Sequence, residues 1–118
     1  MGVKTLFNGA RFVGQAEGDR RKILCLRGPS GYLVAAPQAP RSYSVTVIQR
    51  EAPEVISNKF RGTQITVSTL KAKGHRPDLF DRYFDSLNAL YVMVALGKAR
   101  KLKKRLGKAM LFKISSAK

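Results

Sequence analysis

The chain has 118 residues and 44% of them are hydrophobic, which predicts one globular domain with its own core. Lysine and arginine number 23 against seven acidic residues, so the formal net charge is +16 at pH 7. Charge of this size destabilises a free compact chain by self-repulsion, and it is typical of proteins that bind nucleic acid. The single cysteine, Cys25, excludes an internal disulfide and a thiolate metal cluster, and its apolar neighbours favour a buried position.

Residues 1–21 are predicted to form an extended N-terminal arm. Apolar residues alternate with glycines along this arm, which leads into a first basic cluster at residues 20–22. No secretory signal peptide is expected, because no continuous apolar core follows a basic start. The longest strongly apolar stretch, residues 87–97, has about half of the ~20 residues that a membrane-spanning helix needs. No transmembrane segment is therefore expected.

Residues 22–96 are expected to form a single α+β domain that begins with a β-hairpin. The apolar runs KILCLR (22–27) and YLVAA (32–36) lie on either side of a Gly-Pro-Ser-Gly tetrad. Two short apolar runs around such a tetrad are typical of a hairpin with a four-residue loop.

Two further strands are predicted from the alternation of side chains along the chain. One covers RSYSVTVIQ, residues 41–49, and has Tyr43, Val45 and Val47 on one face. The other covers GTQITVSTLK, residues 62–71. With the hairpin, these strands predict a small, mainly antiparallel sheet of about four strands, because most connections are short and none needs a crossover helix.

An amphipathic helix is predicted from residue 77 onward. Pro77 fits the first helical position, and the aspartates that follow it suit the positive end of the helix dipole. Apolar side chains recur at spacings of three and four from Phe80 to Val94. They form one broad stripe, which we expect to cover the sheet.

Residues 97–118 are predicted to form a basic C-terminal helix and a short tail. The segment GKARKLKKRLGKAM, residues 97–110, contains seven lysines and arginines and no acidic residue. Its narrow apolar stripe is rotated by roughly 90° from the stripe of the preceding helix, so a kink is expected at Gly97. The predicted fold is therefore a small sheet covered by an amphipathic helix that kinks into a basic helix.

Three basic clusters are the candidate RNA-binding sites. The first follows the N-terminal arm, the second is the predicted loop KAKGHR (71–76), and the third is the predicted basic helix. Separated clusters on a compact domain suit several phosphate strands of a folded RNA, which proteins recognise largely by shape. The candidate residues are Arg20, Arg21, Lys22, Lys71, Lys73, His75, Arg76, Lys98, Arg100, Lys101, Lys103, Lys104, Arg105 and Lys108.

Catalysis is not expected from this chain. His75 lies in a basic loop and Cys25 in an apolar strand, and neither has a neighbour that would activate it as a base or nucleophile. The GPSG tetrad lacks the Lys-Ser/Thr ending of a phosphate-binding loop. No enzymatic activity, metal, cofactor or small-molecule substrate is therefore expected.

The size and charge favour a structural ribosomal protein that binds ribosomal RNA and neighbouring proteins of a large assembly. Because no motif assigns the chain to a ribosomal protein family, a lineage-specific protein is expected, in the mitochondrion rather than the cytoplasm. One alternative is an accessory subunit of a membrane-bound respiratory or ATP-synthase complex, whose basic helix contacts anionic lipid or an acidic subunit. A third possibility is a DNA-binding phage or chromatin protein.

Overall fold

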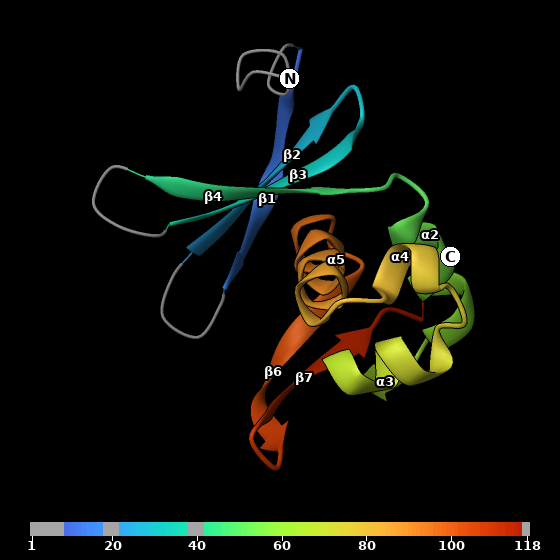
Figure 1. Cartoon of the computed structure of the whole chain (residues 1–118). Coiled ribbons are helices and arrows are strands. Elements are labelled where there is room, and N and C mark those ends of the chain that lie inside the picture. Colours follow the sequence, from blue (N-terminus) through green and yellow to red (C-terminus); the bar gives the residue numbers. More distant parts are fainter. Residues whose placement is uncertain (1–8, 18–21, 38–41, 117–118) are drawn as a thin grey trace.

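The computed structural model describes residues 9–17, 22–37 and 42–116, and its strands form two antiparallel sheets (Figure 1). Sheet A has the strand order β1-β2-β3-β4, and each neighbouring pair is antiparallel. Its strands are β1 (Arg11–Glu17), β2 (Lys22–Gly28), β3 (Gly31–Pro37) and β4 (Tyr43–Ile48). The predicted α+β class and a four-stranded antiparallel sheet are confirmed, but the structure has a second sheet that was not predicted, and the predicted strand over residues 62–71 is not part of sheet A.

The fourth strand of sheet A comes from the segment that was predicted as an N-terminal arm. β1 pairs with β2 and forms one edge of the sheet. Gly14 allows β1 to lie close to the end of α5 (Tyr83–Ala95), because a Cβ atom at this position would lie 2.6 Å from the carbonyl oxygen of Ala95. Residues 11–17 are therefore extended, as predicted, and belong to the folded sheet.

Helix α5 packs against sheet A, and this agrees with the predicted role of the amphipathic helix (Figure 1). Its buried residues include Leu87, Leu90 and Met93, which join Cys25 and Val34 of the sheet in one hydrophobic core. Burial of each large aliphatic side chain contributes about 1.5–3 kcal/mol to stability. The contact between α5 and sheet A is therefore part of one apolar core that stabilises the fold.

The predicted helix is interrupted before α5 begins. A short helix, α4 (Pro77–Phe80), starts with Pro77 in its first turn and ends before the chain enters α5 at Tyr83. The hydroxyl of Ser86 donates a hydrogen bond to the carbonyl oxygen of Phe80 at 3.1 Å and joins the two helices. Tyr83 and Phe84 belong to the predicted apolar stripe but are exposed in the first turn of α5, before its buried residues begin at Ser86.

The strand predicted from the alternation over residues 41–49 is confirmed as β4, but the face that carries most of its apolar side chains is exposed. Tyr43, Val45 and Val47 are all exposed, whereas Ile48 is buried on the opposite face. Thr46 lies on the same side as Ile48, where it faces residues of α5 across a shallow depression. The apolar side of β4 therefore points away from α5.

Two helices flank a very short strand in the middle of the chain. These elements are α2 (Ala52–Phe60), β5 (Gln64–Ile65) and α3 (Val67–Lys73). The strand predicted over residues 62–71 is wrong beyond Ile65, because Thr66 begins a helix. The Thr66 hydroxyl accepts a hydrogen bond from the Thr69 amide at 3.2 Å, and the Thr69 hydroxyl accepts one from the Thr66 amide at 3.2 Å. This reciprocal cap satisfies two backbone donors at the start of α3.

Sheet B contains β5, β7 (Ala109–Ile114) and β6 (Ala99–Leu106) in the order β5-β7-β6. The predicted basic helix is therefore wrong, because most of this segment is an antiparallel hairpin. Lysine, arginine, leucine and alanine favour helix in isolation, but pairing with β7 overrides that preference. Gly97 and Gly107 have φ angles of +75° and +63°, which end α5 and reverse the chain between the two strands.

Candidate nucleic-acid interface

The base of the β6–β7 hairpin belongs to the hydrophobic core. Phe112 and Ile114 of β7 are fully buried, and the ring of Phe112 lies edge-on to that of Tyr91 in α5, with centroids 6.4 Å apart. The amine of Lys113 donates a hydrogen bond to the carbonyl oxygen of Gly62 at 2.6 Å. Lys113 is therefore engaged in holding β7 to the segment that leads into β5.

Strand β6 has no buried residue, whereas every other described strand has at least one. Five of its eight residues are lysine or arginine. Lys101 is half-buried, and the other four cations of the strand are exposed, as are Lys98 before it and Lys108 after it. The cations of β6 are Arg100, Lys101, Lys103, Lys104 and Arg105.

The tip of the hairpin is a two-residue turn, Gly107-Lys108, closed by the pairing of Leu106 with Ala109. Glycine at the first position of such a turn supplies the positive φ angle that tight hairpins need. The Arg105 guanidinium donates a hydrogen bond to the carbonyl oxygen of Lys108 at 3.1 Å, which braces the turn. The tip therefore presents Lys108 on a defined backbone.

The charge of the hairpin has little internal compensation. Residues 86–118 contain no aspartate or glutamate. Within the part of the chain that the structure describes, the side chains of Arg100, Lys103 and Lys104 have no hydrogen bond or ion pair. The pairing register of β6 shifts between Lys101 and Arg105, and such irregularities increase the local twist of a strand.

The second predicted cluster is divided between a helix and a loop. Lys71 and Lys73 are exposed in the last turn of α3, where the negative end of the helix dipole favours cations. His75 is exposed after Gly74, with a φ of +56° that is uncommon for a residue other than glycine. The sequence placed these residues in one loop, whereas the structure places the two lysines on a helix.

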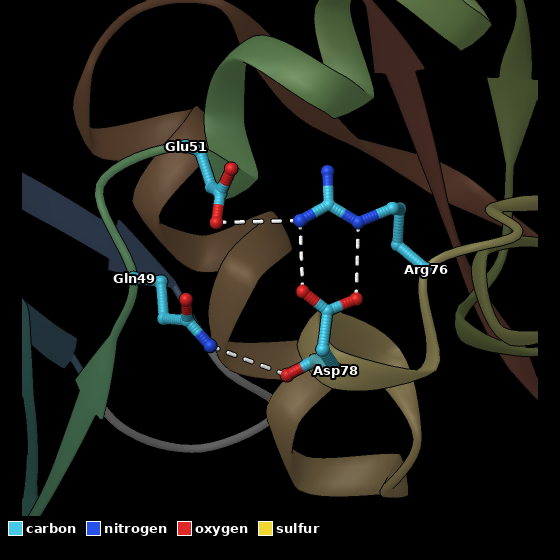
Figure 2. A network of polar contacts seen from close by, with 4 residues as sticks. All are labelled: Gln49, Glu51, Arg76 and Asp78. Atoms are coloured by element: carbon cyan, nitrogen blue, oxygen red, sulfur yellow. Dashed lines mark hydrogen bonds and ion pairs between the residues drawn. The ribbon is translucent and has the colours of Figure 1, made fainter.

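Arg76 is engaged in an ion-pair network that ties α4 to the start of α2 (Figure 2). Its guanidinium donates to both carboxylate oxygens of Asp78, at 3.0 and 2.8 Å, and lies 3.3 Å from a carboxylate oxygen of Glu51. The hydrogen bond from Arg76 lowers the pKa of the Asp78 carboxyl. The Gln49 side chain donates to the backbone carbonyl oxygen of Asp78 at 3.3 Å. Arg76 is already satisfied within the fold, so we do not count it among the proposed phosphate contacts.

The first predicted cluster lies mostly outside the described residues. Arg20 and Arg21 fall in the segment 18–21, which the structure does not describe. Lys22 is exposed at the start of β2, directly opposite Glu17 of β1. Opposite charges that face each other across an antiparallel pair attract, so Lys22 has a neighbour of opposite charge within sheet A.

Sequence reasoning missed one group of arginines. Arg11 of β1 lies directly opposite Arg27 of β2, and both line a shallow depression with Gly9, Gly28 and Pro29. Their proximity depends on the pairing register of two strands, which no spacing along the chain reveals. In the sequence, the two arginines appear only as isolated basic residues, and nothing in their spacing predicts that they are neighbours.

The single cysteine, Cys25, is buried in β2. Burial raises the pKa of the Cys25 thiol to about 11, so it remains protonated and unreactive at neutral pH. No three His, Cys, Asp or Glu side chains among the described residues are grouped in a way that could hold a metal ion. None of the described helices has the length and apolar character needed to cross a membrane.

Comparison of the chain with protein-family models, with curated proteins and with solved structures finds no match in any of the three.

Proposed function

We propose that this protein binds nucleic acid through the phosphate backbone and that the β6–β7 hairpin is its principal contact element. The observation that carries the proposal is β6, a strand of eight residues in which five are cations and none is buried. Burial in the core does not account for such a strand, so an external partner is the physical reason for its composition. Exposed lysines and arginines suit phosphate groups, which position a protein on nucleic acid without reading its sequence.

Ribosomal RNA is the partner that we propose, with the protein as a structural component among neighbouring proteins. The described cations lie on well-separated parts of a molecule whose longest extent is 37 Å. The turn between β6 and β7 and the turn between β2 and β3, next to Arg27, lie at opposite ends of the picture (Figure 1). A folded RNA presents phosphate strands from several directions at once, which supports this use of separated charge. A mitochondrial ribosome remains the location that we propose.

Salt dependence of binding tests the proposal directly. Fluorescence anisotropy of the full chain with a structured RNA should show a linear fall of the logarithm of affinity with the logarithm of salt concentration. If six phosphates are contacted, affinity should fall about 10³-fold between about 50 and 200 mM salt. Binding to anionic vesicles with no binding to RNA would contradict the proposal and favour an accessory subunit of a membrane complex.

Sedimentation of a native lysate tests the ribosomal part of the proposal. Co-migration of the protein with a ribosomal subunit, lost after ribonuclease treatment, is the expected result. Sedimentation that ribonuclease does not change would contradict it. Fractionation of mitochondria before the gradient tests the proposed location in the same experiment.

Binding to duplex DNA is a second candidate, favoured by the order of elements in residues 52–114. Apart from the short helix α4, which lies between α3 and α5, the elements α2, β5, α3, α5, β6 and β7 and the sheet order β5-β7-β6 follow the arrangement of a winged helix-turn-helix domain. In such domains a recognition helix enters the major groove, but here α5 is largely buried and has no lysine or arginine. The hairpin would then be the contact element, since the major groove also admits a two-stranded ribbon. Tighter binding to duplex DNA than to structured RNA at equal salt would favour this candidate.

A further inference from the structure

The paired arginines of sheet A form a feature separate from the hairpin. Arg11 and Arg27 are directly opposite each other in the β1–β2 ladder, where opposed Cβ atoms lie about 4.5–5.5 Å apart. Like charges in this position destabilise a sheet. Among the residues that the structure describes, neither side chain has a hydrogen bond or an ion pair that would offset the repulsion.

A third arginine lies at the same end of the sheet. The guanidinium of Arg50 donates a hydrogen bond to the carbonyl oxygen of Pro29, in the turn between β2 and β3. Pro29 lines the same shallow depression as the two opposed arginines. The carboxylate of Glu51, which follows Arg50 in the chain, lies beside Arg76 instead. No carboxylate belongs to the described lining of this depression.

We propose that Arg11 and Arg27 form a phosphate-binding site on sheet A, distinct from the β6–β7 hairpin. A phosphate oxyanion between the two guanidinium groups would convert their repulsion into two charge-assisted interactions. Guanidinium groups match phosphate geometry because each can donate two parallel hydrogen bonds. The open, shallow shape of the depression suits a single phosphate group at the surface of a larger molecule.

The source of the phosphate is a phosphodiester of the nucleic acid backbone, and this part rests on the proposed function. The site lies beside the β2–β3 turn, at the end of the molecule opposite the hairpin tip in Figure 1. A nucleic acid that contacts both places would therefore wrap around the protein or offer two separate strands. Free inorganic phosphate shares the same chemistry and serves as the second probe.

The first experiment compares salt dependence for the full chain and the double variant Arg11→Gln, Arg27→Gln. Loss of one phosphate contact should reduce the slope of log affinity against log salt by about 1 for structured RNA. The matched control is Lys59→Gln, Arg61→Gln, which removes two exposed cations from another part of the surface. A double variant whose slope equals that of the control overturns the assignment to a backbone phosphodiester.

The second experiment measures thermal unfolding in inorganic phosphate and in chloride at equal ionic strength. At ten times the dissociation constant, phosphate should raise the Tm of the wild-type chain by about 3–6 °C more than that of the double variant. General stabilisation by phosphate appears in both proteins and cancels in the comparison. Equal rises, together with an unchanged salt slope, would overturn the site altogether.

The two experiments separate failure of the site from failure of the proposed function. A phosphate-dependent rise in Tm without any binding to RNA or DNA would support the site and contradict the proposed function. Nucleic-acid binding that depends on the hairpin, with neither effect at Arg11 and Arg27, would contradict the site alone. A reduced salt slope without a Tm effect would support a site that takes a phosphodiester and not free phosphate.

Discussion

Sheet A and sheet B are both antiparallel and both pack against α5, but their outermost regions differ in what they bury. In sheet A, each strand contributes at least one buried residue, and Leu33 and Val34 of β3 are both only 1% exposed. In sheet B, β7 carries the buried Phe112, whereas its partner β6 has no fully buried residue and only three half-buried ones. One hairpin therefore has a strand that supports the core and a strand that faces solvent.

The two neighbouring strands β6 and β7 therefore have different expected roles, β7 in stability and β6 in binding. The core explains the apolar residues of β7, since their removal from water stabilises the fold. The core does not explain the cations of β6, for which we propose a phosphate-bearing partner. We expect substitutions of buried residues in β7 to lower the free energy of unfolding, and substitutions of cations in β6 to lower the affinity for nucleic acid.

The largest expected effect follows from Phe112→Ala. Removal of a fully buried aromatic side chain leaves a cavity and should lower the free energy of unfolding by about 3–5 kcal/mol. Urea denaturation of the purified protein measures this loss. Leu106→Ala, at an exposed position of the same hairpin, is the control and should change stability by less than about 0.5 kcal/mol. Equal effects at both positions would show that the base of the hairpin does not belong to the core.

The triple variant Lys103→Glu, Lys104→Glu, Lys108→Glu tests whether the cations of β6 and its turn bind the partner. Affinity for structured RNA should fall about 10²–10³-fold near 0.1 M salt, because three exposed cations become repulsive to phosphate. Anisotropy titration measures the affinity, and urea denaturation checks that stability is nearly unchanged.

A control with the same change in net charge tests whether position matters in that triple variant. Lys59, Arg61 and Arg82 are exposed and lie outside the hairpin, so glutamate at these three positions should weaken binding much less. Equal losses in the two variants would mean that net charge alone governs binding, and the hairpin would lose its assigned role.

A smaller effect is expected from Arg27→Gln, which tests sheet A as a binding surface. Removal of one of two opposed like charges should raise the free energy of unfolding by about 0.2–1 kcal/mol in chloride at low salt. This gain corresponds to a rise in Tm of about 1–4 °C, measurable by circular dichroism. Lower stability than wild type would contradict a repulsion between the two arginines.

The smallest effect is expected from the ion pair between Arg76 and Asp78, because both side chains are partly exposed. The hydrogen bond from Arg76 lowers the folded-state pKa of Asp78 below its ordinary value of 3.8, so the ion pair stabilises the protein at pH values above 3.8. Stability from this source is lost as the pH falls through the lowered pKa. Acid unfolding of Asp78→Asn should therefore depend less on pH below about pH 4 than that of wild type. Asp81→Asn is the charge-matched control, and an identical profile for the two variants would contradict the prediction.

Three of the four strands of sheet A and most of α5 were predictable, because their side chains follow clear periodicities, whereas β1 was predicted only as an extended arm. The alternation along β4 corresponds to one exposed face and an opposite face on which Ile48 is buried. The stripe that includes Leu87 and Leu90 is the buried face of α5. Two other segments were assigned wrongly because local preference conflicted with tertiary pairing. The residues of β6 favour helix, and Val67 at the start of α3 favours strand. The signals that decide both cases are short: a glycine turn at Gly107, and a threonine cap at Thr66.

The candidate site was predictable in composition but not in geometry. The hairpin cations were predicted as a site because many lie close together in the sequence. That prediction holds for the same residues whether the segment forms a helix or a hairpin. Arg76 has the same side chain as its basic neighbours, but its two carboxylate partners come from different helical segments and satisfy it internally. Arg11 and Arg27 are 16 positions apart, and only the register of β1 on β2 brings them together.

The buried Cys25 has a practical consequence for mapping the partner. Because the Cys25 side chain is only 1% exposed and burial raises the pKa of its thiol, maleimide reagents should leave this position unmodified in the folded protein. A cysteine introduced by Lys108→Cys would then be the one reactive thiol of the native chain. A photoactivatable cross-linker attached there would report, nucleotide by nucleotide, what the tip of the hairpin touches.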